Sequence, residues 1–249
     1  MILAALASAL ALIFAAVVAG RFSRSRRPAF AAWTLGLLIF SGAAAFQAAG
    51  EAGGFSQVTF RGFYLLGGAL GVIYLALGTV FLLAPSRVAW VCAAVLAVIT
   101  VVLAVDAAVI PVDQSLLSTP AGVLGGTTQH PTFPQGSPLY IGVVFLNIIG
   151  TIVLVAGSAW SAYRYFRQRA GIDRVVCNLL LTAGALIIAY GFSAAKTLGV
   201  GSLDVLGAYE AAGIAVMFAG FLSLGRIGQR NPQGSPVRSP APTAAGSAD

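Results

Sequence analysis

The strongest constraint on this chain is a series of seven apolar stretches, each long enough to cross a bilayer. A hydrocarbon core of about 30 Å requires about 20 consecutive apolar residues in a helix. Pro85, Ser86 and Arg87 divide one long apolar run into two such stretches. We therefore predict an all-α polytopic integral membrane protein, a bundle of seven transmembrane helices. The predicted spans are about 2–20, 28–50, 62–84, 88–111, 138–160, 175–195 and 205–225.

The composition excludes a soluble domain. Only 8% of the residues are charged and 59% are hydrophobic, whereas soluble domains carry about 25% charged residues. The formal net charge of +7 would suggest nucleic acid in a soluble protein. In a membrane protein this charge follows the topology, so we expect no nucleic-acid partner.

The basic residues predict the orientation of the spans. Cytoplasmic loops of membrane proteins carry an excess of Lys and Arg. Of the fourteen basic residues, only Arg61 and Lys196 fall on the side that also carries the N-terminus. We predict that the N-terminus is outside and the C-terminus inside, with a transmembrane domain at 1–225 and a disordered cytoplasmic tail at 226–249. The first span lacks a preceding basic region, so we expect it to be uncleaved. The abundance of Arg, Ala and Gly favours a bacterial cell membrane as the location.

A parallel internal repeat is a further hypothesis. Phe46-Gln47-Ala48-Ala49 precedes Tyr64, and Phe192-Ser193-Ala194-Ala195 precedes Tyr209 at nearly the same spacing. The layout would be three helices, a linker helix and three helices. Substrate sites often lie between such repeats.

The same alignment suggests ion pairs at the outer ends of the two halves. We predict that Glu51 pairs with Lys196, and that Arg61 pairs with Asp204 or Glu210. Exposed pairs of this kind contribute only about 0–1 kcal/mol.

Two acids are the main candidates for chemistry. Asp106 and Glu210 each lie about five residues inside the outer end of a predicted span, roughly 7–8 Å below the boundary. Acids inside spans usually face the bundle interior and mark functional sites. The alternative is that each acid pairs with a nearby basic residue or contacts interfacial water.

The other polar and small residues inside the spans could either bind a ligand or pack the helices together. Asn147, Gln47 and Tyr209 are candidate ligand contacts, although buried amides more often join helices. Gly67, Gly71 and Gly78 share one predicted helical face with Tyr64 and Tyr74, which indicates a packing seam. The loop at 112–137 is either a lid or a solvated connector.

Enzyme and cofactor signatures are scarce. His130 is the single histidine, no CxxC occurs, and we expect no metal site, no cofactor and no catalytic residues. The last span has no lysine for a retinal Schiff base. We predict a non-enzymatic binding module, a sensor or assembly subunit, with an outer-facing cavity for a ligand, a lipid or a membrane protein partner. The alternatives are a small-solute or proton-coupled transporter using Asp106 and Glu210, and an enzyme acting on lipid.

Overall fold

The computed structural model describes residues 1–126, 129–167, 172–198 and 202–226, although some side chains near the ends of α8 and α9 lie outside the description. Within these residues the chain is all-helical, apart from one isolated β-bridge between Gly126 and Pro131. The predicted tail is 226–249; Arg226 is the last residue of the final helix, and the rest of that range lies outside the described residues.

Seven helical segments of the described chain are long and apolar enough to cross a membrane, which confirms the prediction of seven apolar spans. The third segment, Gln57–Leu83, contains three elements, and the other six are single helices. The elements of the seven segments are α1 (Ile2–Ser25), α2 (Pro28–Gly53), α3 (Gln57–Phe63), η1 (Tyr64–Gly71), α4 (Val72–Leu83), α5 (Ser86–Val109), α7 (Pro138–Arg167), α8 (Ile172–Leu198) and α9 (Ser202–Arg226).

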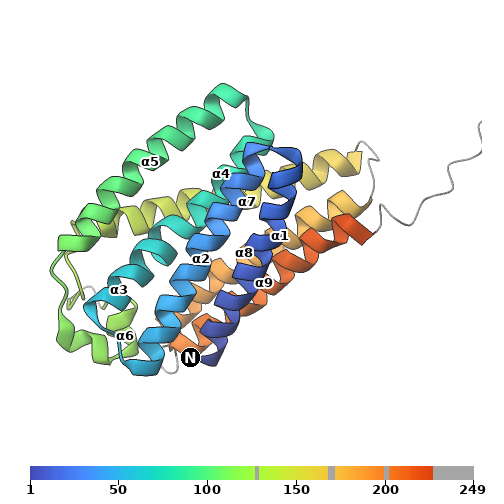
Figure 1. The fold of residues 1–249 in the computed structure, drawn as a ribbon. Helices are drawn as coiled ribbons and strands as arrows, with labels where there is room; N and C mark the ends of the chain where they lie inside the picture. Colours follow the sequence, from blue (N-terminus) through green and yellow to red (C-terminus); the bar gives the residue numbers. More distant parts are fainter. Residues whose placement is uncertain (127–128, 168–171, 199–201, 227–249) are drawn as a thin grey trace, which may run out of the picture.

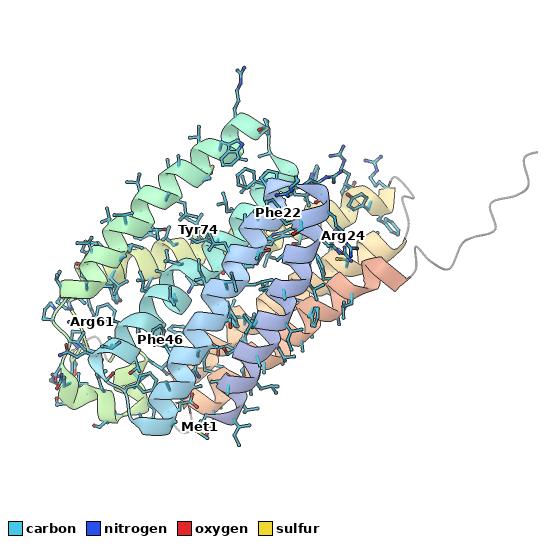
Figure 2. The ribbon with its side chains drawn as sticks, in the orientation of Figure 1. Met1, Phe22, Arg24, Phe46, Arg61 and Tyr74 are labelled. Atoms are coloured by element: carbon cyan, nitrogen blue, oxygen red, sulfur yellow. The ribbon has the colours of Figure 1, made fainter. Side chains whose placement is uncertain are left out.

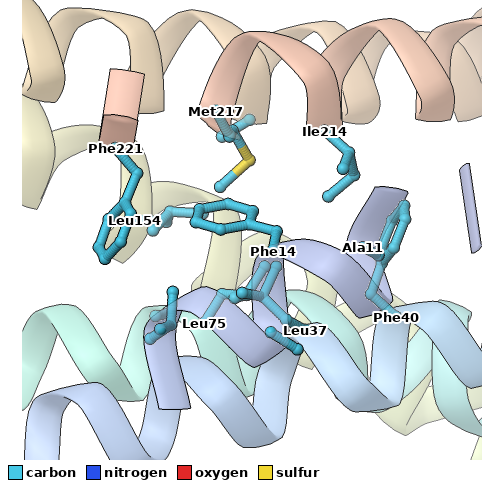
Figure 3. Packing of buried hydrophobic residues seen from close by; sticks show 13 residues of the cluster. Ala11, Phe14, Leu37, Phe40, Leu75, Leu154, Ile214, Met217 and Phe221 are labelled. Carbon is cyan, nitrogen blue, oxygen red and sulfur yellow. The ribbon is translucent and has the colours of Figure 1, made fainter. Parts of the chain in front are cut away.

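The centre of the bundle is an aromatic and aliphatic cluster around Phe14. Phe14 of α1 stacks on Phe218 of α9 with ring centroids 5.0 Å apart, and it lies 5.3 Å from the Phe221 ring. Figure 3 shows Leu37 and Leu75 on the opposite side of Phe14. The first helix therefore lies between α9 and the pair formed by α2 and α4 (Figure 1).

Helix α5 lies at the edge of this bundle. In Figure 1 it leans away from its neighbours, and few of its residues are buried, among them Ala89, Leu96, Leu103 and Ala107. This peripheral position is one that a linker helix could occupy. The internal repeat itself stays a prediction.

The third span departs from the regular α-helix that the sequence spacing suggested. It begins with a capping box, in which Ser56 and Thr59 exchange hydrogen bonds between side chain and backbone. Residues Tyr64–Gly71 then form a π-helix. The segment contains Gly67, Gly68 and Gly71, and Gly has a low α-helical propensity. π-Helical turns are rare and are often found at functional sites.

The three glycines of the predicted packing seam do not all face the same neighbour. A Cβ atom at Gly67 would lie 3.0 Å from the Ala43 Cβ of α2, and one at Gly78 would collide with the Trp33 ring of the same helix. These two glycines allow α2 to approach the third span closely. A Cβ atom at Gly71 would instead approach the carbonyl oxygen of Leu66 in its own π-helix at 3.2 Å.

The described part of the long loop packs against one end of the bundle. It contains a 3₁₀ turn, η2 (Gln114–Ser118), and one short helix, α6 (Pro120–Val123). Leu117, Leu124 and Phe133 of this loop are buried in a cluster with Phe60 and Tyr64 of the third span. This apolar anchoring distinguishes the loop from a freely solvated connector.

Candidate functional site: an apolar cavity with a buried carboxylate

A cavity of about 450 Å³ is lined by residues of α2, the third span, α7, α8 and α9. This volume falls within the range of about 300–1,000 Å³ that is typical of small-molecule sites. Most of its lining is apolar, and the polar side chains among the described lining residues are Glu210, Asn147 and Thr151. An apolar cavity with a few polar groups is the usual form of a binding site.

Glu210 is the most unusual residue of this cavity. It lies in α9, it is only 8% exposed, and its Oε2 atom has no hydrogen-bond partner among the described residues. A buried polar group without a partner is costly, and a buried charge more so. An unsatisfied group of this kind in a native structure requires an explanation.

Asn147 joins the cavity wall to the π-helix. Its Nδ2 atom donates a hydrogen bond to the Gly68 carbonyl oxygen at 3.0 Å. The sequence left open whether Asn147 joins helices or binds a ligand. The structure assigns one N–H of its amide to the first role, and Asn147 also lines the cavity.

The cavity borders the outside of the bundle along α7. Ile148 and Ile152 both line the cavity, yet they are 55% and 61% exposed. Helices α7 and α8 meet near the Ser161–Asn178 hydrogen bond of 3.1 Å and diverge toward their other ends (Figure 1). Since these residues belong to spans, we infer that the opening faces lipid.

Asp106 has a different environment from Glu210. Its Oδ2 atom accepts a hydrogen bond of 2.8 Å from the Leu139 backbone amide, at the start of α7. It does not line the cavity that contains Glu210. The structure therefore does not bring the two acids together at one site, and it gives Asp106 a capping contact that the sequence did not indicate.

Arg61 binds backbone rather than an acid. Its Nη1 and Nη2 atoms donate to the carbonyl oxygens of Ala108 and Ile110, at 2.9 and 2.7 Å. The predicted pair of Arg61 with Asp204 or Glu210 is thus replaced by a cap on the C-terminal end of α5. Cations at helix C-termini satisfy free carbonyl groups and interact favourably with the helix dipole. Figure 2 shows Arg61 at the end of the molecule that also carries Met1.

The acids of this end surround the amino group of Met1. Glu51 forms an ion pair with that amino group, and Asp204 lies 3.4 Å from it. Gln47 is fully buried, and its Nε2 atom donates to Glu51 at 2.8 Å. The predicted partner of Glu51, Lys196, has a side chain outside the described residues.

A second hollow of about 880 Å³ is formed at the same end, lined by Glu51, Asp204 and part of the long loop. Nearby in that loop, Asp113 accepts hydrogen bonds from the Ser115 hydroxyl and backbone amide. These bonds lower the pKa of Asp113 below its usual value, the hydroxyl contributing most.

Tyr209 lies apart from the Glu210 cavity. Its ring makes an edge contact with Tyr190, with centroids 5.6 Å apart, and it packs over Gly191. Sequence reasoning missed Gly68 as a polar contact, because a backbone carbonyl leaves no signal in residue type. It also missed the small residues of α8 and α9 that bring these helices together.

No family model, curated protein or solved structure matches this chain. Among the described residues, no three His, Cys, Asp or Glu side chains gather where they could hold a metal ion.

Proposed function

We propose that this protein is a non-enzymatic membrane protein that binds a small amphiphilic molecule, a lipid or lipid-like ligand, in the cavity beside Glu210. The observation that carries the proposal is a buried carboxylate oxygen without a partner, on the wall of an otherwise apolar cavity. An amphiphile matches both properties, because its chain would fill the apolar volume and its polar end would meet Glu210.

The exposure of Ile148 and Ile152 supports a route of entry through the bilayer. A ligand dissolved in lipid reaches such an opening without crossing water. From the distribution of Arg we further propose that the protein lies in the cell membrane with its N-terminal end outside. In that orientation the ligand would come from the outer half of the bilayer.

Photolabelling tests the site directly. The probe is a long-chain alcohol carrying a diazirine, added to the protein in lipid nanodiscs, with labelled peptides identified by mass spectrometry. We expect labels to concentrate on cavity residues of α7 and α8, and Ala189→Trp, which fills the cavity, to reduce them. Leu186→Trp is the matched control, because Leu186 is 48% exposed on the same helix and does not line the cavity.

Uniform labelling would contradict the proposal. The exposed face of α5, including Val98 and Val101, reports labelling by ordinary lipid contact. If the cavity residues are labelled no more than this face, and Ala189→Trp has no more effect than Leu186→Trp, the cavity does not bind amphiphiles.

Transport remains the competing function, since the carboxylate of Glu210 could also move protons or solutes. Proton and solute flux in proteoliposomes separates the two functions. Binding without flux supports a binding module that acts as a sensor or assembly subunit through a membrane partner. Flux that is lost in both Asp106→Asn and Glu210→Gln would support the transporter instead.

A further inference from the structure

We infer that the cavity selects amphiphiles whose polar end is a protonated amine, in preference to fatty acids and other anionic lipids. This inference rests on the proposed binding function and names its ligand class. Three observations carry it: the buried oxygen of Glu210 without a partner, the acceptor oxygen on a neighbouring polar residue, and the absence of basic residues from the described lining.

The first observation is the side chain of Glu210. Its Oε2 atom is buried and has no hydrogen-bond partner among the described residues. An ammonium group supplies a hydrogen-bond donor and a compensating positive charge together. Hydrogen bonds in which both groups are charged are stronger than neutral ones, and they gain further in a medium of low dielectric constant.

The second observation concerns the neighbouring polar groups. Asn147 uses one N–H of its amide for the Gly68 carbonyl, and its carbonyl oxygen is an acceptor on a residue that lines the cavity. An ammonium group has three donor hydrogens and no acceptor. Glu210 and Asn147 therefore present acceptors to a ligand end that requires them.

The third observation concerns charge of the opposite sign. No Lys, Arg or His is among the described residues that line the cavity. A fatty acid carboxylate or a lipid phosphate would enter without a cation to meet it, beside another carboxylate. Burial of an unpaired charge is strongly unfavourable, so anionic lipids are selected against.

The lining of the cavity favours an apolar chain. Ile148 and Ile152 extend from the lining to the exposed surface of α7, so a chain can pass between the bundle and the surrounding lipid. The ligand end binds at Glu210, and its alkyl chain lies along apolar residues such as Val144 and Ile188.

The test compares three probes of equal chain length. Dodecylamine, dodecanol and dodecanoate compete with the diazirine alcohol for labelling of the cavity in nanodiscs at pH 7. An alkylamine is protonated at this pH, as is the lysine side chain with its pKa of about 10.4. We expect dodecylamine to compete at concentrations about tenfold lower than dodecanol, as one charge-assisted hydrogen bond implies, and dodecanoate to compete least.

The variants assign the preference to Glu210. Glu210→Gln keeps the size of the side chain and removes the group that can carry a negative charge opposite an ammonium, so we expect it to abolish the preference for the amine while the alcohol still competes. Asp204→Asn is the control, because Asp204 lies on the same helix and is exposed outside this cavity. Each variant is first checked for an unchanged gel-filtration profile.

The outcomes separate this inference from the proposed function. Equal competition by the three probes, or an amine preference that survives in Glu210→Gln, would overturn the amine inference and leave amphiphile binding intact. Absence of competition by every probe, together with no cavity labelling, would refute the binding function itself.

Discussion

The Asp106 carboxylate accepts a hydrogen bond from the Leu139 backbone amide at 2.8 Å, so an acid of α5 caps the first turn of α7. The first amides of a helix have no partner within the helix. A carboxylate at this end also interacts favourably with the helix dipole. This contact is the reason to separate Asp106 from Glu210 in any mechanism.

The Asp106 cap predicts a graded series of variants. Asp106→Asn retains an oxygen acceptor and should change stability little. Asp106→Ala removes it and should destabilise the protein by about 1 kcal/mol, the usual effect of losing a helix cap. The measurement is thermal unfolding in detergent followed by circular dichroism. If Asp106 instead carried protons, Asp106→Asn would abolish proton flux as fully as Asp106→Ala, although it leaves the helix cap in place.

Arg61 should be more important for stability than its position near the end of the bundle suggests. It donates to two carbonyl oxygens at the end of α5, and α5 has few other buried contacts. We expect Arg61→Met to cost about 1.5–3 kcal/mol, because hydrogen bonds to charged groups are lost. Urea unfolding of the variant beside Arg61→Lys provides the measurement. Equal stability of Arg61→Met and the wild type would contradict this account of α5.

The spans were predictable because the bilayer imposes their length and hydropathy on each stretch of sequence separately. The burial of Glu210 was predictable for a related reason, since an acid inside an apolar span usually faces the bundle interior. These features depend on local sequence and on the solvent, so no knowledge of neighbouring helices was required.

The partners of charged groups were not predictable in the same way. Asp106 binds a backbone amide 33 residues away, and Arg61 binds two backbone carbonyl groups. Because every residue has such backbone groups, the sequence does not indicate which of them a charged side chain will contact. The alignment of the two halves instead pointed to oppositely charged side chains. The π-helix was missed because spacings of three and four residues were interpreted as a regular α-helix. One of its carbonyl groups, that of Gly68, accepts a hydrogen bond from Asn147 of another helix, and this contact is not visible in the local sequence.

The Asn147 contact predicts a moderate loss of stability. Asn147→Leu has a similar volume but leaves the Gly68 carbonyl without this donor. Interhelical hydrogen bonds in membrane proteins contribute about 0.6 kcal/mol on average, and we expect a loss of about that size. Hydrogen exchange of the 64–71 segment should increase at the same time. Faster exchange spread evenly over all spans would indicate general destabilisation instead of a local role.

The contact between α8 and α9 predicts that a small substitution there destabilises the protein. A Cβ atom at Gly184 would lie 2.5 Å from the Gly213 carbonyl oxygen, and one at Gly213 would lie 2.7 Å from the Gly184 carbonyl. The backbone cannot move aside as a side chain can, so Gly184→Val should push the two helices apart. We expect it to lower the free energy of unfolding by about 1–3 kcal/mol, the usual effect of overpacking. Gly20→Val is the matched control, because a Cβ atom at Gly20 has nothing within 4 Å. Thermal unfolding monitored by gel filtration should show early loss of the monodisperse peak for Gly184→Val alone. Equal melting of the two variants would mean that α8 and α9 do not depend on this close approach.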